Sequence, residues 1–173
     1  MSSLEFVHPD PVFVPQWHVW RQHEQARLHN PIEDEHESEL LARVLLQKAE
    51  LGQLEEGKIH RWFVLEGKEV VGTVAIEQYN PRMRSASFGY HIAPNCAGRG
   101  LGTQIVRQFI KDVFFKTTID RLIATVHKDN IASKKILSKV GFVFEGTLRQ
   151  YLIVRGERVD FELYSILRTD SVS

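Results

Sequence analysis

Residues 85–116 constrain the fold more than any other part of the sequence, because they predict a strand, a glycine-rich turn and a long helix in succession. The strand covers 85–92, and the helix, 101–116, carries apolar residues at helical spacing. Three glycines fall within 98–102, and a chain without Cβ atoms lets backbone N–H groups converge on one point. The helix start adds unpaired N–H groups and a positive dipole end, so the turn is suited to bind a phosphate group.

The glycine-rich turn by itself is also compatible with a tight connection that binds nothing. No Gly-Lys-Ser or Gly-Lys-Thr follows it, so it is not a Walker loop. It also comes after several predicted strands, whereas a dinucleotide-binding turn follows the first strand of its βαβ unit. A nucleotide-binding module stays among the alternatives, and it predicts that NAD or ATP binds at this turn.

The rest of the sequence predicts helices first and a sheet afterwards. The expected elements are a strand at 4–7, helices at 14–30 and 33–51, strands at 62–65 and 70–76, a helix at 131–140, and strands at 142–144 and 159–166. Strand 85–92, helix 101–116 and strand 121–127 form a βαβ unit, so the two strands should be parallel neighbours. The sequence therefore predicts one mixed α/β domain over residues 1–173, with a central sheet flanked by helices.

Composition excludes several classes of function. Lys and Arg number 22 and Asp and Glu number 22, and this zero net charge argues against binding along a nucleic-acid backbone. Cys96 is the single cysteine, and none of the eight histidines has the spacing of a zinc site, so no metal is expected. There is no apolar run of about 20 residues and no secretion signal, which indicates a cytoplasmic protein without a membrane partner.

Two blocks of sequence resemble the GNAT family of N-acetyltransferases. The first joins Gly-Tyr-His-Ile-Ala-Pro at 89–94 to Gly-Arg-Gly-Leu-Gly at 98–102 and is similar to the family's pyrophosphate-binding motif. The second has Asn-Ile-Ala-Ser at 130–133, Lys-Val-Gly-Phe at 139–142 and Glu-Gly at 145–146. This second block resembles the branch that contains the ribosomal-protein N-terminal acetyltransferases. Both blocks occur in the family's order and at its usual distance.

The resemblance implies the GNAT acyl-CoA N-acyltransferase fold and acetyl-CoA as co-substrate. In this fold the sheet is mixed and twisted, and the parallel strands, here 85–92 and 121–127, splay apart to admit pantetheine. By resemblance, the backbone groups of His91, Ile92 and Ala93 hold the pantetheine and the thioester. A backbone N–H near Ile92 is also expected to stabilise the oxyanion that develops on the thioester.

The resemblance assigns the other end of the co-substrate to the turn and the following helix. Backbone N–H groups of the turn are expected to bind the pyrophosphate, namely those of Gly98, Arg99, Gly100, Leu101, Gly102 and Thr103. Asn130 is expected to contact pantetheine or to fix the local turn. The same asparagine also fits a plain N-cap for the helix that follows it, and both interpretations are compatible.

The reaction implied is direct attack of an amine on the thioester. By resemblance, Ser133 bonds to the coenzyme sulfur and protonates the leaving thiolate. Many relatives in other branches use a tyrosine for this step at the position where Leu137 stands here. In this branch a carboxylate often occupies the position of Ser87, so the general base is open. Glu77 and His127 are the candidates, although each also fits a solvated carboxylate or a loop histidine. A chain of water molecules with no dedicated base is a third option.

The expected activity is therefore transfer of an acetyl group from acetyl-CoA to a primary amine. The amine belongs to a protein N-terminus or to a small molecule such as a polyamine or an amino sugar. The alternative is a non-catalytic sensor that binds acyl-CoA on the same fold. Edge strands in such folds often pair between copies, which makes a homodimer an expected assembly.

Overall fold

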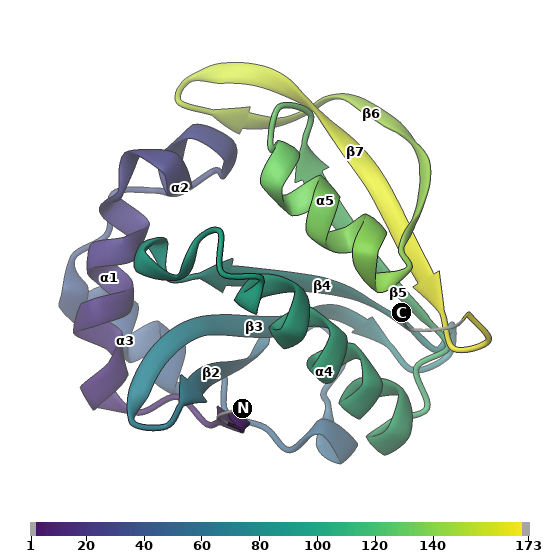
Figure 1. Cartoon of the computed structure of the whole chain (residues 1–173), viewed down its shortest axis with the longest axis horizontal. Coiled ribbons are helices and arrows are strands. Elements are labelled where there is room, and N and C mark those ends of the chain that lie inside the picture. Colours follow the sequence, from purple (N-terminus) through teal and green to yellow (C-terminus); the bar gives the residue numbers. More distant parts are fainter. Residues whose placement is uncertain (1–2, 171–173) are drawn as a thin grey trace.

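The computed structural model describes residues 3–170 and contains one seven-stranded mixed sheet with helices on both faces (Figure 1). The strand order is β1-β2-β3-β4-β5-β7-β6. The strands are β1 (Leu4–Val7), β2 (His60–Glu66), β3 (Glu69–Asn80), β4 (Ser85–Ile92), β5 (Arg121–His127), β6 (Val143–Val154) and β7 (Glu157–Leu167). Strands from both ends of the chain thus share one sheet. The first two and last three residues of the expected domain, 1–173, lie outside the described residues.

The predicted parallel pair is confirmed, and its two strands separate. Residues 85–87 of β4 pair with 121–123 of β5 in parallel. Beyond that point β4 continues to pair only with β3, up to Ile92. In the same way β5 pairs with β7 as far as His127. The sheet is therefore open between these two strands over the second half of β4.

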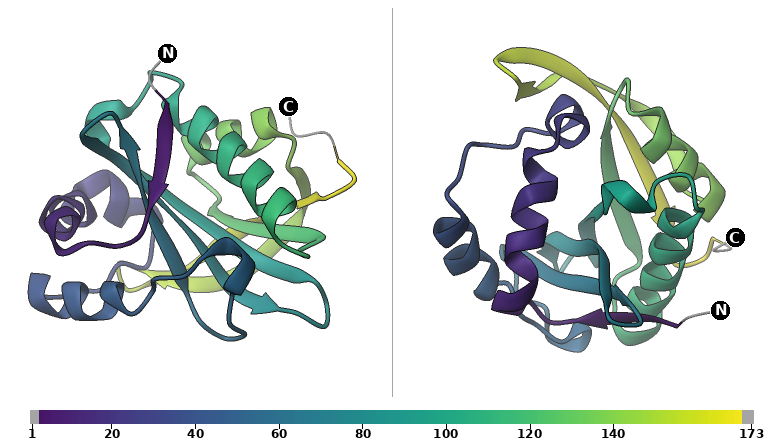
Figure 2. Two further views of the ribbon diagram at one scale, coloured as in Figure 1. Left: turned by 90° about the horizontal axis from the view of Figure 1, so that it is seen from below. Right: turned by 60° about the vertical axis from the view of Figure 1, so that its left-hand side comes forward.

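The α-helices within residues 3–170 cover both faces of the sheet (Figure 2). The helices are α1 (Val14–Gln22), α2 (Glu24–His29), α3 (Glu37–Leu45), α4 (Leu101–Lys116) and α5 (Ile131–Val140). Of these, α4 and α5 lie on the face opposite to α1 and α3. Phe109 of α4 packs against Trp62 of β2 and Phe88 of β4 on one face. Trp17 of α1 packs edge-on against Phe63 of β2 on the other face. None of the helices within residues 3–170 combines the length and apolar composition needed to cross a membrane.

The expected helix at 14–30 is wrong in extent, because the chain breaks at His23. The backbone of His23 is extended, with ψ 136°, and it separates α1 from α2. Trp17 and Trp20 anchor α1 in the core. The break lets α2 leave that direction and bring Ala26 to the wall of a cavity.

The expected helix at 33–51 is also shorter than predicted. It begins after His36, whose side chain accepts a hydrogen bond from the backbone N–H of Ser38, while Glu39 bonds back to the His36 backbone N–H at 3.0 Å. This reciprocal cap fixes the start of α3. Glu35 therefore precedes the helix instead of lying in its first turn, and its carboxylate bonds to the guanidinium of Arg43 at 2.7 Å.

The last two strands are longer than predicted and form one hairpin. Their two-residue turn consists of Arg155 and Gly156, with φ 54° and 84°. Positive φ at both positions is the turn geometry that joins twisted antiparallel strands. β6 is an edge strand and most of its residues are exposed, so it lacks the alternating apolar pattern that would have predicted its length.

Candidate active site

A cavity of about 820 Å³ lies where β4 and β5 separate. Its walls come from both strands, from the glycine-rich turn, from the start of α5 and from α2. The lining residues fall within 23–30, 88–94, 96–103, 124–127 and 129–139. Its volume is within the range of sites that enclose a small molecule, and it joins all the segments that the sequence assigned to co-substrate binding.

The glycine-rich turn has the backbone conformation that only glycine adopts without strain. Gly98 and Gly100 have φ values of 78° and 76°, in the left-handed region. A Cβ atom at either position would meet nothing within 4 Å, so the space beside the turn is open. Gly100 is the N-cap of α4, and the first N–H groups of this helix therefore lie beside that open space. This arrangement suits a phosphate group.

Gly102 has a different purpose, because α4 and α5 approach each other closely there. A Cβ on Gly102 would lie 2.8 Å from Cδ1 of Ile136 and 3.3 Å from Cγ1 of Ile92. Thr103 and Gly102 both line the cavity. The side chains of Arg99 and Leu101 do not: Leu101 is buried in the core, and the Arg99 guanidinium lies 3.3 Å from Glu66. Only the backbone N–H groups of those two residues fit the predicted role.

The backbone of β4 presents its free groups to the opening at alternate residues. The N–H of Ala93 donates to the Val71 carbonyl at 2.9 Å, and the carbonyl of His91 points at β3, since it lies 2.7 Å from where a Gly72 Cβ would be. Adjacent residues in a strand direct these groups to opposite sides. The backbone of Ile92 therefore faces the opening, whereas the Ala93 N–H and the His91 carbonyl are directed at β3. The roles expected of the three backbones toward pantetheine stay predictions.

Asn130 and Ser133 lie where the sequence places them, at the start of α5. Asn130 Oδ1 accepts the backbone N–H of Ser133 at 3.1 Å, so Asn130 is the N-cap of α5. The Ser133 hydroxyl shares a hydrogen bond of 2.7 Å with the hydroxyl of Tyr90. Burial raises the pKa of Tyr90 to about 12, although its bond to Ser133 acts in the opposite direction. Tyr90 therefore stays protonated at neutral pH.

Sequence reasoning missed the side chain of Tyr90. The strand alternation of 85–92 offered a signal, because Phe88 and Tyr90 must share the face that α4 and α5 cover. Nothing in the sequence indicated that this face would bring the Tyr90 hydroxyl to Ser133. Leu137, at the position where many relatives carry a tyrosine, is fully buried in the core.

His127 lies at the end of β5 and lines the cavity. Its Nδ1 accepts the backbone N–H of Asp129 at 3.1 Å, and its ring packs against those of Phe161 and His29. A neutral imidazole has one donor and one acceptor nitrogen. The neutral ring therefore carries its proton on Nε2.

Glu77 is not itself among the residues that line the cavity, but its carboxylate lies beside one of them, since a Cβ on Gly89 would be 3.8 Å from Glu77 Oε1. It is on β3, opposite Ser87 of β4, and its carboxylate is 4.0 Å from the guanidinium of Arg61. The structure thus brings Ser133, Asn130 and His127 together and leaves Glu77 outside the group. Among residues 3–170, no three His, Cys, Asp or Glu side chains are grouped so that they could hold a metal ion.

His91 points its side chain to the α1 face of the sheet and also lines the cavity. Trp17 donates its Nε1–H to His91 Nδ1 at 3.2 Å, and the ring of Trp20 lies edge-on at 6.1 Å. Burial first, and then the positive charges of Arg21 and Arg61, lower the pKa of His91 to about 4. His91 is therefore neutral at pH 7, with its proton on Nε2.

The family model described as acetyltransferase (GNAT) domain matches residues 4–143. The chain belongs to the GNAT acetyltransferase family, and the fold expected from the resemblance is confirmed. Among curated proteins, the uncharacterized N-acetyltransferase YoaA of Bacillus subtilis is 33% identical over 110 residues, 62% of each chain. The matched part spans less than two thirds of the length of YoaA and of two further curated relatives.

Two solved structures illustrate the fold. The ribosomal L7/L12 alpha-N-protein acetyltransferase RimL, in complex with coenzyme A, has a TM-score of 0.81 and 20% identity, covering 96% of this chain and 95% of its own. Spermidine N-acetyltransferase from Vibrio cholerae, in complex with coenzyme A and spermine, has a TM-score of 0.85 and 20% identity, covering 98% of both chains. At this identity the likeness concerns the fold alone.

Proposed function

We propose that the protein transfers the acetyl group of acetyl-CoA to a primary amine by direct attack on the thioester. The observation that carries this proposal is the opening between β4 and β5, which continues into the cavity and ends at the glycine-rich turn. Membership of the GNAT family supports it. A single domain over residues 1–173 is proposed to carry the activity, acting in the cytoplasm.

Acetyl-CoA fits the cavity with its pyrophosphate at the turn. The N–H groups from Gly98 to Thr103 provide the donors, and the left-handed glycines leave the space beside them open. Ile92 offers its backbone to the pantetheine arm and the thioester carbonyl. Because the donors belong to a fixed strand, they stabilise negative charge on that oxygen without reorganising during the reaction.

The leaving group is proposed to receive its proton from Ser133. As the amine nitrogen bonds to the carbonyl carbon, the carbon–sulfur bond breaks and the sulfur takes a proton from the Ser133 hydroxyl. The hydroxyl of Tyr90, at 2.7 Å, holds the Ser133 hydroxyl in place and passes a proton to it, and Tyr90 is then reprotonated from water, which takes up the proton that the amine loses. Tyr90 is buried and protonated, so it is available as a donor.

The proton lost by the amine is proposed to leave through water. Neutral His127 carries its proton on Nε2, and Glu77 lies outside the cavity lining. An amine that is already neutral needs no base to begin its attack. This absence of a dedicated base matches acceptors whose amine has a pKa near 8 better than those near 10.

Thiol release from acetyl-CoA tests the proposal directly. The purified protein is mixed with acetyl-CoA and, in turn, with peptides that have a free N-terminus, polyamines and amino sugars. Turnover with any of these amines supports the transferase. Tight binding of acetyl-CoA in calorimetry with no turnover across the whole panel supports the acyl-CoA sensor instead, and binding of NAD or ATP in place of acetyl-CoA supports the nucleotide module. A homodimer stays a prediction, for which sedimentation is the measurement.

A further inference from the structure

The acceptor end of the cavity holds a hydrogen-bond donor in a fixed state. His91 lines the cavity, and the indole N–H of Trp17 occupies its Nδ1 at 3.2 Å. The remaining nitrogen, Nε2, therefore carries the proton of the neutral ring. Trp20, which is also on α1, packs edge-on against the His91 ring at 6.1 Å and limits its rotation. The imidazole is thus prepared to donate to an oxygen of a bound acceptor.

Positive charge surrounds this donor. Arg21 and Arg61 both act on His91, and both guanidinium groups lie over the ring of Trp17, at 5.3 and 4.6 Å from its centroid. His23, which also lines the cavity, acts on His91 in the same direction. This field favours an acceptor that brings a partial or full negative charge to the ring.

Each arginine has a carboxylate nearby, and neither carboxylate reverses the field at His91. Glu35 lies 3.4 Å from Arg21, and Glu77 lies 4.0 Å from Arg61. Arg21 and Arg61 nevertheless both lower the pKa of His91. Each carboxylate is thus paired with an arginine that offsets its negative charge near His91.

The cavity is poor in the groups that a polyamine requires. Among its described lining residues, Asp129 alone carries a carboxylate, and that side chain is 68% exposed. Lys139 and the imidazoles of His23, His29 and His127 are on the same lining. A molecule with several ammonium groups would lose hydration here and find in return one exposed carboxylate on the lining and, beside Gly89, that of Glu77, which Arg61 already neutralises at 4.0 Å.

We propose that the acceptor is an α-amino acyl unit, that is, a primary amine one carbon away from a carbonyl or carboxylate oxygen. The oxygen accepts the Nε2–H of His91 under the field of Arg21 and Arg61, and the amine is thereby directed at the thioester. This inference rests on the proposed acetyl transfer and deepens it. The unit occurs in free amino acids and at polypeptide N-termini, and at a polypeptide N-terminus its amine has a pKa near 8.

A panel of small amines on the unaltered protein tests the inference first. The acceptors are L-alanine, the peptide Ala-Ala-Ala, isopropylamine and spermidine, each with acetyl-CoA and thiol detection. Isopropylamine is alanine with a methyl group in place of its carboxylate, so it lacks the oxygen for His91. We expect kcat/KM for alanine or the peptide to exceed that for isopropylamine and for spermidine by about 100-fold or more. The ratio between alanine and the peptide identifies which source of the unit is preferred.

Substitutions of His91 test the residue itself. His91→Phe keeps a ring beside Trp20 and removes the donor, and we expect KM for the preferred acceptor to rise about 10-fold. His91→Gln keeps an N–H donor and should recover part of that loss. The KM for acetyl-CoA should stay within twofold in both variants, because the co-substrate contacts the backbone of β4. His8→Phe, remote from the cavity lining, is the matched control and should change neither constant.

The outcomes separate this inference from the function on which it rests. Turnover of spermidine or isopropylamine as efficient as that of alanine and the peptide overturns the inference and leaves the transferase intact. An unchanged acceptor KM in folded His91→Phe overturns the role of His91. No turnover with any amine, despite calorimetric binding of acetyl-CoA, overturns the proposed function and this inference together.

Discussion

The hydroxyl oxygens of Tyr90 and Ser133 lie 2.7 Å apart, although 43 positions separate the two residues in the sequence. One belongs to β4 and the other to α5, so the contact exists only because the helix packs over the opened strand. The pair is buried on the tyrosine side, where burial keeps the phenol protonated. The proposed proton donor to the leaving thiolate thus has a second hydroxyl behind it.

Tyr90→Phe should lower kcat about 10-fold and leave the KM for acetyl-CoA within twofold, because the ring stays and only the hydroxyl is lost. Ser133→Ala should lower kcat by a similar or larger factor. If Tyr90 acts through Ser133, the double variant should be no slower than Ser133→Ala alone. Steady-state kinetics of the four proteins provides the measurement, and additive losses would show that Tyr90 works independently of the serine.

Gly100→Glu should abolish acetyl-CoA binding, because the new carboxylate occupies the space beside the turn and repels the pyrophosphate. The left-handed backbone also strains any substitution at φ 76°. Gly57→Glu is the matched control, since Gly57 has φ 75°, equally open surroundings and a place outside the cavity lining. Both variants should lose about 1–2 kcal/mol of unfolding free energy. Calorimetry should then show an affinity loss of at least about 100-fold for Gly100→Glu only.

An unchanged affinity for acetyl-CoA in folded Gly100→Glu would show that the pyrophosphate does not bind at this turn. A comparable loss in Gly57→Glu would instead attribute the effect to backbone strain.

Glu77→Gln should change kcat by less than about threefold, because the carboxylate lies beside Arg61 and outside the cavity lining. The amide retains a hydrogen-bond acceptor for the guanidinium, so the fold should be kept. The measurement is kcat with the preferred acceptor at pH 7 and 8. A loss of about 100-fold or more with normal acetyl-CoA affinity would identify Glu77 as the general base after all.

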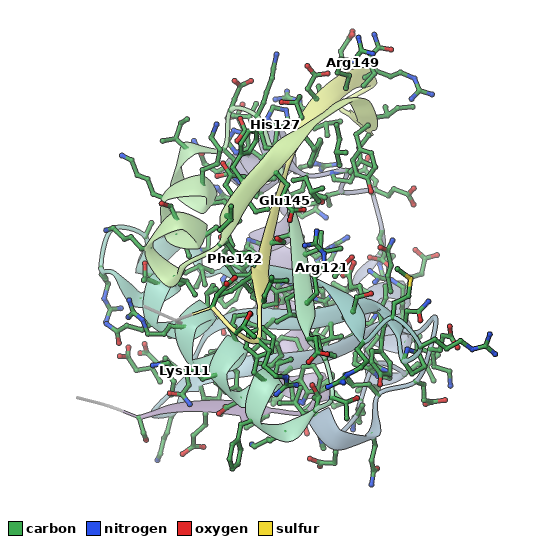
Figure 3. The ribbon with its side chains drawn as sticks, turned by 90° about the vertical axis from the view of Figure 1, so that its right-hand side faces the viewer. Lys111, Arg121, His127, Phe142, Glu145 and Arg149 are labelled. Carbon is green, nitrogen blue, oxygen red and sulfur yellow. The ribbon has the colours of Figure 1, made fainter. Side chains whose placement is uncertain are left out.

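Glu145→Gln should destabilise the protein by about 1 kcal/mol at pH 7, a modest amount because the ion pair is a third exposed. Glu145 bonds to both terminal nitrogens of Arg121 and accepts the Ser165 hydroxyl at 2.7 Å, which joins β5, β6 and β7 (Figure 3). First the Arg121 hydrogen bond and then that of Ser165 lower the pKa of Glu145 to about 2 from 4.5.

The pH dependence of that destabilisation follows from the lowered pKa. A carboxyl whose pKa is lower in the folded state stabilises the fold above its unfolded pKa, and the effect is lost as pH falls through the folded value. The difference between the natural protein and Glu145→Gln should therefore shrink between pH 4.5 and about 2. Urea unfolding across this range measures it. Glu56→Gln, at an exposed turn, is the control, and a difference that stays constant with pH would contradict the assignment.

The sequence predicts those parts of the fold whose information is local. Apolar periodicity and glycine spacing identify the strand, turn and helix of 85–116, and the structure confirms each of them. The break at His23 and the late start of α3 were missed because a backbone kink and a histidine cap leave no periodic signal. The strand predicted at 142–144 is shorter than β6, because an exposed edge strand buries neither face and so shows no apolar pattern.

The candidate site divides in the same way. The turn and the N-cap Asn130 depend on residues close together in the chain, so their types and spacing were sufficient. The contacts of Tyr90 with Ser133 and of Trp17 with His91 span 43 and 74 positions. Such contacts are set by how α5 and α1 dock on opposite faces of β4, and no local pattern encodes that docking.

The alternation of β4 gives the strand two separate chemical tasks. Its main chain at Ile92 is proposed to hold the co-substrate, and a main-chain group is kept when the side chain is substituted. Its side chain at His91, on the other face, is proposed to meet the acceptor. Variation at that position can therefore retune which amine is accepted while the shared donor of acetyl groups is still held. This makes position 91 the point at which to begin engineering a different acceptor range on an unchanged acetyl-CoA site.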